Sequence, residues 1–273
     1  MINKGSAFAL ETKNLTKRFG DQIAVNGISL HVGTGEILAI LGPNGAGKTT
    51  FIRMASTLLK PDDGEARIFG HDVCHEADQA RQYIGLTGQE TSLDEELTAM
   101  QNLNFFCQLY GMKKAEAREK AESLLHEFSL FDAKDKYVWQ FSGGMRRRLD
   151  LAVSLISKPK LIFLDEPTTG LDPRTRIQIW NTLKQLVSEG STLILTTQYL
   201  EEAEQLADNI AIIDKGEVKA FGTPNELKEM VREKTSAKDP SMDDVFFATT
   251  EENEQERNKT KGRRDSLWMR PRR

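Results

Sequence analysis

Strand-length apolar runs punctuate the chain and set its predicted architecture. Glu36–Leu41 leads into a glycine-rich segment, Leu161–Glu166 ends in two carboxylates, and Thr192–Thr196 is a third run. Runs that are apolar almost throughout are typical of parallel strands with both faces of the sheet covered. The pattern therefore predicts an α/β protein with a mainly parallel central sheet.

The remaining pattern adds helices and an antiparallel β part. Helical spacing covers Thr49–Leu59, Leu97 to about Phe131, Arg146–Ile156, Pro173–Val187 and Tyr199–Leu206. In the second of these, we expect Leu103, Phe106, Leu109 and Tyr110 to form one face. Phe8–Leu15 and Ile23–Val32 alternate in places and predict N-terminal antiparallel strands, and Asn209–Phe221 reads as a hairpin.

These elements suggest a division of the chain. We expect a main domain at 1–222, with a helical subdomain inserted at about 90–157. The composition shifts at Thr223, and we expect 223–250 to form an extension packed on the domain. The tail, 251–273, is acidic and then strongly basic; disorder is the usual state of such tails, and contact with anionic lipid is the alternative.

The glycine-rich segment carries the strongest chemical signal. It fits the phosphate-binding loop pattern G-x-x-x-x-G-K-[ST] with Gly42, Pro43, Asn44, Gly45, Ala46, Gly47, Lys48, Thr49 and Thr50. Its glycines let backbone N–H groups converge on one anion, Lys48 reaches the β- and γ-phosphates, and the Thr49 hydroxyl holds Mg²⁺. A glycine turn that binds nothing is the alternative. The strand before it and the helix after it favour a nucleoside triphosphate site.

Composition narrows the class of protein. The chain has 273 residues, 38% of them hydrophobic and 29% charged, and a net charge of −4, so general attraction to nucleic acid is not expected. Cys74 and Cys107 are far apart, which argues against a disulfide framework or a zinc site and for a reducing cytosol. We also expect no membrane span and no signal peptide.

Three further segments carry candidate chemistry. Asp165 and Glu166 end a predicted buried strand, where ligands bind in open α/β sheets. Phe19, before a glycine turn, either stacks on adenine or belongs to the core. Ser142 is a plausible N-cap, followed by the run Arg146–Arg148 near a helix N-terminus, where the dipole disfavours cations. These arginines mark either a functional site or a solvated helix face.

Together these motifs resemble the nucleotide-binding subunit of an ABC transporter. The combination comprises the phosphate-binding loop, Ser142-Gly143-Gly144 one helix before Leu161–Glu166, and Pro167–Pro173 directly after it. The resemblance covers roughly Phe8 to Phe247 and is strongest to the drug-efflux group typified by daunorubicin resistance ATPases. It implies the fold of a P-loop NTPase and hydrolysis of ATP with Mg²⁺.

The resemblance also assigns roles. It makes Phe19 the ring that stacks on adenine, Asp165 a Mg²⁺ ligand, and Glu166 the group that polarises the attacking water. Gln89 contacts Mg²⁺, that water and the membrane partner. Ser142, Gly143 and Gly144 bind the γ-phosphate of ATP held by another subunit, and Asp172 lines the interface between the two subunits, the seam. ATP therefore closes a head-to-tail homodimer.

Two positions depart from the family pattern. Gln198 stands where the family usually has a histidine that contacts the γ-phosphate; an amide still donates a hydrogen bond but cannot become cationic. We therefore expect slow-to-normal hydrolysis. Met145 stands where the family usually has a glutamine after Ser142-Gly143-Gly144. We expect this change to affect phosphate binding little, because Ser142 and the backbone bind the phosphate.

The implied function is an ATPase subunit that energises export of a drug or lipophilic compound. A separate membrane permease binds it at the cytoplasmic face, near Gln89 and Leu97–Tyr110. Phe105, Phe106 and Tyr110 are candidate contacts, although we expect at least two of them to serve core packing. The alternative is an ABC-type ATPase that acts on the ribosome or DNA, which the negative net charge disfavours.

Overall fold

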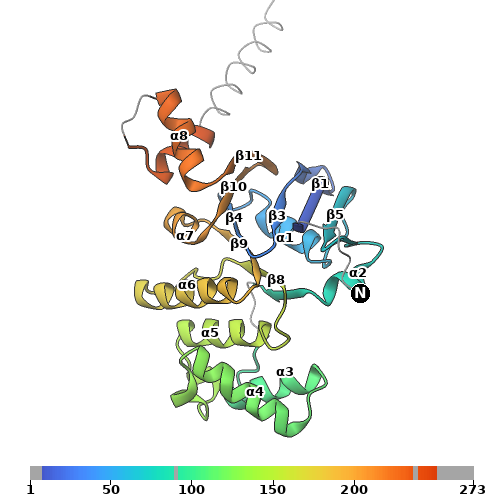
Figure 1. The fold of residues 1–273 in the computed structure, drawn as a ribbon, viewed down its shortest axis with the longest axis vertical. Coiled ribbons are helices and arrows are strands. Elements are labelled where there is room, and N and C mark those ends of the chain that lie inside the picture. Colours follow the sequence, from blue (N-terminus) through green and yellow to red (C-terminus); the bar gives the residue numbers. More distant parts are fainter. Residues whose placement is uncertain (1–7, 89–91, 236–238, 251–273) are drawn as a thin grey trace, which may run out of the picture.

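A mainly parallel sheet forms the centre of the computed structural model, which describes residues 8–88, 92–235 and 239–250 (Figure 1). Within these residues its strand order is β11-β10-β4-β9-β8-β7. The strands are β4 (Ile37–Leu41), β7 (Ile84–Thr87), β8 (Leu161–Asp165), β9 (Thr192–Thr197), β10 (Asn209–Asp214) and β11 (Glu217–Gly222). Neighbouring strands are parallel except for β10 and β11. The predicted fold class is confirmed.

A second, antiparallel sheet lies beside the first. It contains β1 (Phe8–Phe19), β2 (Gln22–Ile28), β3 (His31–Gly33), β5 (Asp63–Ile68) and β6 (His71–Asp72). The predicted strand Ile23–Val32 is two strands, because β2 pairs with the second half of β1 while β3 pairs with its first half. β1 itself continues to Phe19 and not only to Leu15.

Alternate residues of the central strands enter two cores. In β4, Ile37, Ala39 and Leu41 face one core, and Leu38 and Ile40 face the other. The first core also contains side chains of α5, α6 and α7, and the second contains those of α1 and the antiparallel sheet. Both faces of the sheet are therefore buried, which explains why its strands are apolar throughout.

The helices are shifted relative to the sequence pattern. They are α1 (Lys48–Ala55), α2 (Ala77–Arg81), α3 (Ala99–Leu109), α4 (Lys114–Glu127), α5 (Gly143–Ser154), α6 (Pro173–Ser188), α7 (Leu200–Leu206) and α8 (Pro224–Thr235). α1 ends before the predicted Leu59, since Thr57 adopts a positive φ of 70°. The predicted helical region Leu97–Phe131 is interrupted at Gly111, with φ 83°.

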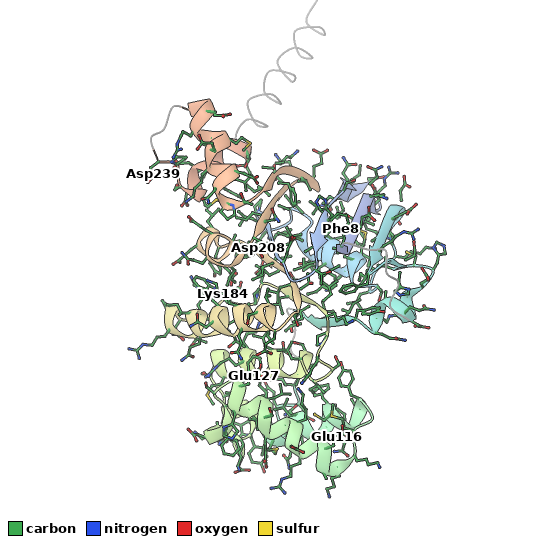
Figure 2. All side chains as sticks on the ribbon, in the orientation of Figure 1. Phe8, Glu116, Glu127, Lys184, Asp208 and Asp239 are labelled. Carbon is green, nitrogen blue, oxygen red and sulfur yellow. The ribbon has the colours of Figure 1, made fainter. Side chains whose placement is uncertain are left out.

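The helices α3, α4 and α5 form a lobe at the opposite end of the molecule from α8 (Figure 1). Figure 2 labels Glu116 and Glu127 in this lobe and Phe8 in the antiparallel sheet. The expected apolar face of α3 is partly wrong. Leu103 is buried and Phe106 packs on the core, but Leu109 and Tyr110 are 66% and 54% exposed. The face is instead completed by Ala99, Asn102 and Cys107.

The chain beyond β11 folds back on the protein. Leu227 and Val231 of α8 are buried, and so are Met242 and Val245 in a helical stretch at 242–250. All four belong to the same core cluster as α7. In the part of the chain that the structure describes, every helix is too short or too polar to cross a membrane.

Candidate functional site

Four parallel strands end at one edge of the central sheet and bring the candidate motifs together. Leu41, at the end of β4, pairs with Thr197 of β9, and Asp165, at the end of β8, pairs with Thr196. β7 runs parallel to β8 and ends at the same edge with Thr87. The loops that follow these strands therefore meet at the place where open α/β sheets bind ligands.

The phosphate-binding loop passes so close to other backbone that two of its positions must be glycine. A Cβ at Gly42 would lie 2.2 Å from the Ile213 carbonyl oxygen. A Cβ at Gly47 would lie 2.3 Å from the Ala24 carbonyl oxygen, and Gly47 has φ 106°. This tight loop, followed at once by the N-terminus of α1, suits backbone binding of phosphate.

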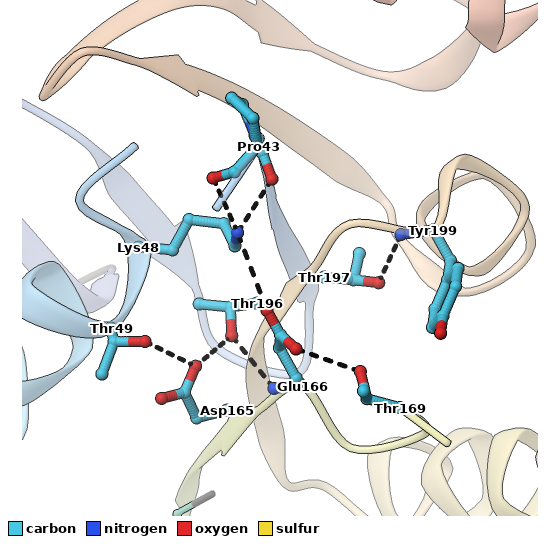
Figure 3. Close-up of polar contacts among 10 residues, drawn as sticks. Pro43, Lys48, Thr49, Asp165, Glu166, Thr169, Thr196, Thr197 and Tyr199 are labelled. Carbon is cyan, nitrogen blue, oxygen red and sulfur yellow. Dashed lines mark hydrogen bonds and ion pairs between the residues drawn. The ribbon is translucent and has the colours of Figure 1, made fainter. Parts of the chain in front are cut away.

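Lys48 is buried at the start of α1 and points back across the loop (Figure 3). Its Nζ donates to the carbonyl oxygens of Gly42 at 2.8 Å and Pro43 at 3.1 Å, and lies 3.8 Å from Oε1 of Glu166. Burial lowers the pKa of Lys48, while the carboxylates of Glu166 and Asp165 oppose that shift. The ammonium group is therefore held beside both carboxylates.

One carboxylate oxygen of Asp165 accepts hydrogen bonds from two hydroxyl groups. Its Oδ1 accepts from Thr49 Oγ1 at 3.2 Å and from Thr196 Oγ1, and its residue is only 4% exposed (Figure 3). A carboxylate and a hydroxyl beside a phosphate loop are the hard oxygen donors that Mg²⁺ takes when phosphates and water complete its shell. The donor set of Asp165 and Thr49 fits this ion.

Glu166 stands in an unusual backbone conformation for a residue with a side chain. Its φ is 50°, and its N–H donates to the carbonyl oxygen and Oγ1 of Thr196 at 3.2 and 3.1 Å. Its Oε2 accepts from Thr169 Oγ1 at 3.1 Å. Such a conformation costs on the order of 1–3 kcal/mol and persists only where the surroundings impose it, typically at functional sites.

A cavity of ≈ 320 Å³ joins these groups to the antiparallel sheet. Its lining consists of Phe19, Gln22, Ala24, Asn44, Gly45, Gly47, Lys48, Thr49, Thr50 and Glu166. Phe19 is 53% exposed, so of the two interpretations of this ring, core packing is wrong. An exposed ring near a phosphate loop and a lysine fits a nucleotide with a flat base at one end and phosphates at the other.

The turn Ser142-Gly143-Gly144, which we call the signature turn, lies at the start of α5 and outside the lining of this cavity. Ser142 is exposed and caps α5, its Oγ accepting from Met145 N at 3.3 Å, which confirms the predicted N-cap. A second cavity, of ≈ 680 Å³, lies between the two motifs. Its lining includes Asn44 of the phosphate loop, Gly143 of the signature, and Glu166.

Asp172 caps α6, and Thr175 N and Oγ1 donate to its carboxylate at 3.0 and 2.7 Å. These hydrogen bonds hold the pKa of Asp172 below its usual value. Ser142, Gly144, Asp172 and Gln198 line neither of the two cavities. Gln198 follows β9 directly and is exposed. Gln89 lies outside the described residues, directly after Gly88.

The sequence alone did not find two polar groups that support the site, Thr196 and Glu202. Thr196 bonds both Asp165 and Glu166, and its only sequence signal is a hydroxyl at the end of an apolar strand. Glu202 is fully buried and accepts from Thr168 Oγ1 at 2.7 Å and Trp180 Nε1 at 2.9 Å. It thereby ties α6 and α7 to the segment after Glu166.

A third supporting group, Arg147, belongs to the arginine run for which the sequence left open a functional site or a solvated helix face. The run of three arginines at the start of α5 is not a solvated face. Arg146 donates to the carbonyl oxygens of Val138 and Trp139, and Arg148 to those of Phe128 and Ser129. Arg147 turns the other way, toward the end of β8. All three cations are thus fixed by backbone oxygens, which offsets the unfavourable helix dipole.

Comparison with known proteins agrees with this geometry. A family model described as ABC transporter matches residues 25–169. The chain is 54% identical to a daunorubicin/doxorubicin resistance ATP-binding protein of Streptomyces peucetius over 83% of this chain and 69% of that protein. It is 43% identical to the Nod factor export ATP-binding protein I of Rhizobium sp. (strain N33), over 82% and 74% of the two chains.

Among solved structures, an ATP-binding cassette in a dimeric, post-hydrolysis state with ADP and phosphate superposes with a TM-score of 0.72 at 28% identity. The superposition covers 78% of this chain and 98% of that one. The family match spans the phosphate loop, the signature turn and Glu166. This chain belongs to the ATP-binding subunits of ABC transporters.

Proposed function

We propose that this subunit hydrolyses ATP with Glu166, Lys48 and Gln198 as its catalytic side chains, and drives export through a separate permease. One observation carries the proposal: Lys48 Nζ lies 3.8 Å from Glu166, and Thr196 bonds both Glu166 and Asp165, so the three groups converge at the carboxyl edge of the sheet. Phosphoryl transfer needs charge compensation and an oriented water, and this cluster offers both.

Each residue has a distinct task. Gly42, Pro43, Asn44, Gly45, Ala46, Gly47 and Thr50 form the loop that wraps the phosphates, and Phe19 stacks on the base. Lys48 leaves its carbonyl partners for the β- and γ-phosphates. Glu166, aimed across the cavity by its backbone conformation, orients the water and takes its proton.

Mg²⁺, where bound, neutralises charge on the β- and γ-phosphates, and Thr49 and Asp165 are the residues that would hold it. Gln89, which lies outside the described residues, is proposed as a further contact to the ion and to the water. Gln198 is exposed at the end of β9, where its amide donates to the γ-phosphate.

A second copy of the chain completes the site. Ser142, Gly143 and Gly144 of one copy cap the γ-phosphate held by the other, and Asp172 lines the seam. The exposure of Ser142 and Gly143 at a helix N-terminus supports this, because a capped turn with open backbone amides binds anions. ATP thus closes a head-to-tail homodimer and hydrolysis releases it. A related cassette is itself known as a dimer with ADP and phosphate bound.

We assign these tasks to an ABC-type ATPase domain at 1–222, with a helical subdomain at about 90–157 and an extension at 223–250. The transported compound is a drug or another lipophilic molecule, supported by the names of the relatives, which refer to daunorubicin and doxorubicin resistance and to Nod factor export. The word export in the second kind of name supports a transport role over a ribosome- or DNA-bound ATPase.

The permease contacts the exposed apolar side chains of α3, at the cytoplasmic face of the membrane. Phe105, Leu109 and Tyr110 are 51%, 66% and 54% exposed, contrary to our expectation that most of the candidate aromatics pack in the core; only Phe106 does so. Phe105→Ser with Tyr110→Ser should reduce copurification with the permease. Leu58→Ser, at a 62% exposed leucine beyond α1, is the matched control.

The basic part of the tail, 257–273, is proposed as a contact to anionic lipid. Deletion of 251–273 should weaken binding to vesicles that contain phosphatidylserine and leave binding to neutral vesicles unchanged. Equal binding with and without the tail would exclude this contact.

Export itself is tested by expressing the subunit with its permease in drug-sensitive cells. Wild type should lower the accumulation of daunorubicin, and Glu166→Gln should abolish that effect while the subunit still copurifies with the membrane protein. Efflux that persists with Glu166→Gln would exclude Glu166 as the hydrolytic residue. Comigration with ribosomes in place of membranes would favour the alternative.

A further inference from the structure

Arg147 makes several side-chain hydrogen bonds near the site and has no role in the mechanism above. It extends from the second turn of α5, and its side chain is 11% exposed. Nε donates to the Pro167 carbonyl oxygen at 2.9 Å, and Nη2 to the Asp165 carbonyl oxygen at 3.0 Å. These two carbonyls flank Glu166 on either side.

The remaining nitrogen, Nη1, reaches a different strand. It donates to the carbonyl oxygen of Gly88, at the end of β7, at 2.9 Å, and lies 3.4 Å from Oδ2 of Asp150. Gly88 directly precedes Gln89 in the sequence. One guanidinium therefore joins the end of β7 to the backbone on both sides of Glu166.

The backbone of Glu166 needs such a restraint. A φ of 50° is costly for glutamate, and the Thr196 contacts to the Glu166 N–H hold only the peptide plane between Asp165 and Glu166. Arg147 bonds the carbonyl of that same plane, at Asp165, and also the carbonyl of Pro167, so it fixes the chain on both sides of Glu166. Arg147 also shares α5 with the Ser142 cap, so a movement of this helix would displace the guanidinium that bonds the carbonyls of Asp165 and Pro167 beside Glu166.

We propose that Arg147 is a positioning residue for Glu166, which links the signature helix of a chain to the hydrolytic glutamate of the same chain. The inference rests on the proposed function, in which Glu166 orients the attacking water. The planar fork of arginine sends separate donors to three carbonyls, whereas a lysine ammonium is a point charge that satisfies fewer of them. Arg147→Lys keeps the charge and loses the alignment.

The neighbouring arginine provides a matched control. Arg148 uses a single nitrogen, Nη1, for the carbonyl oxygens of Phe128 and Ser129, at 3.0 and 3.2 Å, and both lie within the helical lobe. A lysine can reproduce that point contact. Arg148→Lys should therefore change kcat less than twofold, in the same helix and with the same chemical substitution.

The test is ATPase kinetics on the full chain. Arg147→Lys should lower kcat about ten- to hundredfold, the cost of a small misplacement of a catalytic group, and leave KM for ATP within about twofold. In a Glu166→Gln background, Arg147→Lys should lower the residual ATPase rate less than about twofold, since the carboxylate that Arg147 positions is already removed. The double variant should still form an ATP-dependent dimer. Arg147→Gln, which keeps a planar amide, is the second variant if Arg147→Lys folds poorly.

Wild-type kcat in Arg147→Lys would overturn the proposal, and so would an equally large loss on top of Glu166→Gln, which would indicate a general structural effect. A similar loss in Arg148→Lys would do the same. If Glu166→Gln alone hydrolysed ATP at the wild-type rate, the assignment of Glu166 would fail first, and the role of Arg147 with it.

Discussion

The two glycines of the signature turn lie next to each other but in different surroundings, and this difference predicts opposite effects of alanine. A Cβ built at Gly143 meets nothing within 4 Å. A Cβ at Gly144 would lie 2.7 Å from Cγ2 and 3.2 Å from Oγ1 of Thr175, in the first turn of α6. Thr175 cannot turn away freely, because its Oγ1 donates to Asp172 at 2.7 Å.

These contacts set the magnitudes. Gly144→Ala overpacks the α5–α6 contact, at about 1–3 kcal/mol, offset by up to about 1 kcal/mol of helix propensity. We expect it to destabilise the fold by about 1–2 kcal/mol. Thr175→Ser removes Cγ2 and keeps the hydroxyl, so the double variant should recover most of that loss. Gly143→Ala should leave the free energy of unfolding unchanged or slightly raised.

The expected effects on function are reversed. At Gly143 the methyl group points into the open face that we assign to the partner's γ-phosphate. Overpacking there, by about 1–3 kcal/mol, lowers the affinity of the ATP-bound dimer about 5- to 150-fold. Urea unfolding measures the change in stability, and the dependence of the ATPase rate on protein concentration measures the affinity of the ATP-bound dimer.

A result in which Gly143→Ala unfolds as easily as Gly144→Ala would show that the turn is packed, contrary to the structure. If Gly143→Ala hydrolysed ATP at the wild-type rate at low protein concentration, Gly143 would not lie in the dimer interface. Failure of Thr175→Ser to rescue Gly144→Ala would assign the destabilisation to something other than the predicted clash.

Three further predictions concern hydrolysis and pH. Gln198→Ala removes one neutral donor and should slow hydrolysis about fivefold, for about 1 kcal/mol; an unchanged rate in steady-state assays would exclude the γ-phosphate contact. Chelation of Mg²⁺ should abolish hydrolysis, and Thr49→Val should raise the Mg²⁺ concentration needed for half-maximal rate; an unchanged Mg²⁺ titration would exclude the Thr49 ligand. Burial raises the pKa of Asp150 to about 6, against the opposing charge of Arg147 and the Ser92 N–H. Because the folded state then holds this proton more tightly than the unfolded chain, the stability of wild type relative to Asp150→Asn should fall by about 2 kcal/mol as pH rises from about 4 to 7; a pH-independent difference in urea unfolding would contradict it.

The sequence predicts most of this site because its motifs are local. The phosphate loop joins a strand to a helix, Ser142 caps the helix that follows it, and Asp165 ends an apolar strand; each depends on neighbours in the chain. Local pattern also explains the errors in α3, where helical spacing does not reveal that Leu109 and Tyr110 extend past the end of the buried face.

The supporting contacts could not be predicted in this way. Arg147 bonds carbonyls that lie 18, 20 and 59 residues away. Every residue has a backbone carbonyl, so the sequence does not indicate which ones an arginine will bond. Thr196 meets Asp165 only because β8 and β9 are neighbours in the sheet. Phe19 could be either core or exposed until the end of β1 was placed in space.

The central claim is that each chain binds ATP with its Lys48 side and caps a second chain's ATP with its Ser142 side. The most direct measurement is sedimentation of Glu166→Gln with ATP, with and without Mg²⁺, together with the amount of nucleotide that remains bound. We predict a dimer that retains two ATP molecules, and monomers for Lys48→Ala under the same conditions. A Glu166→Gln protein that stays monomeric at high concentration, with no trapped nucleotide, would contradict the account.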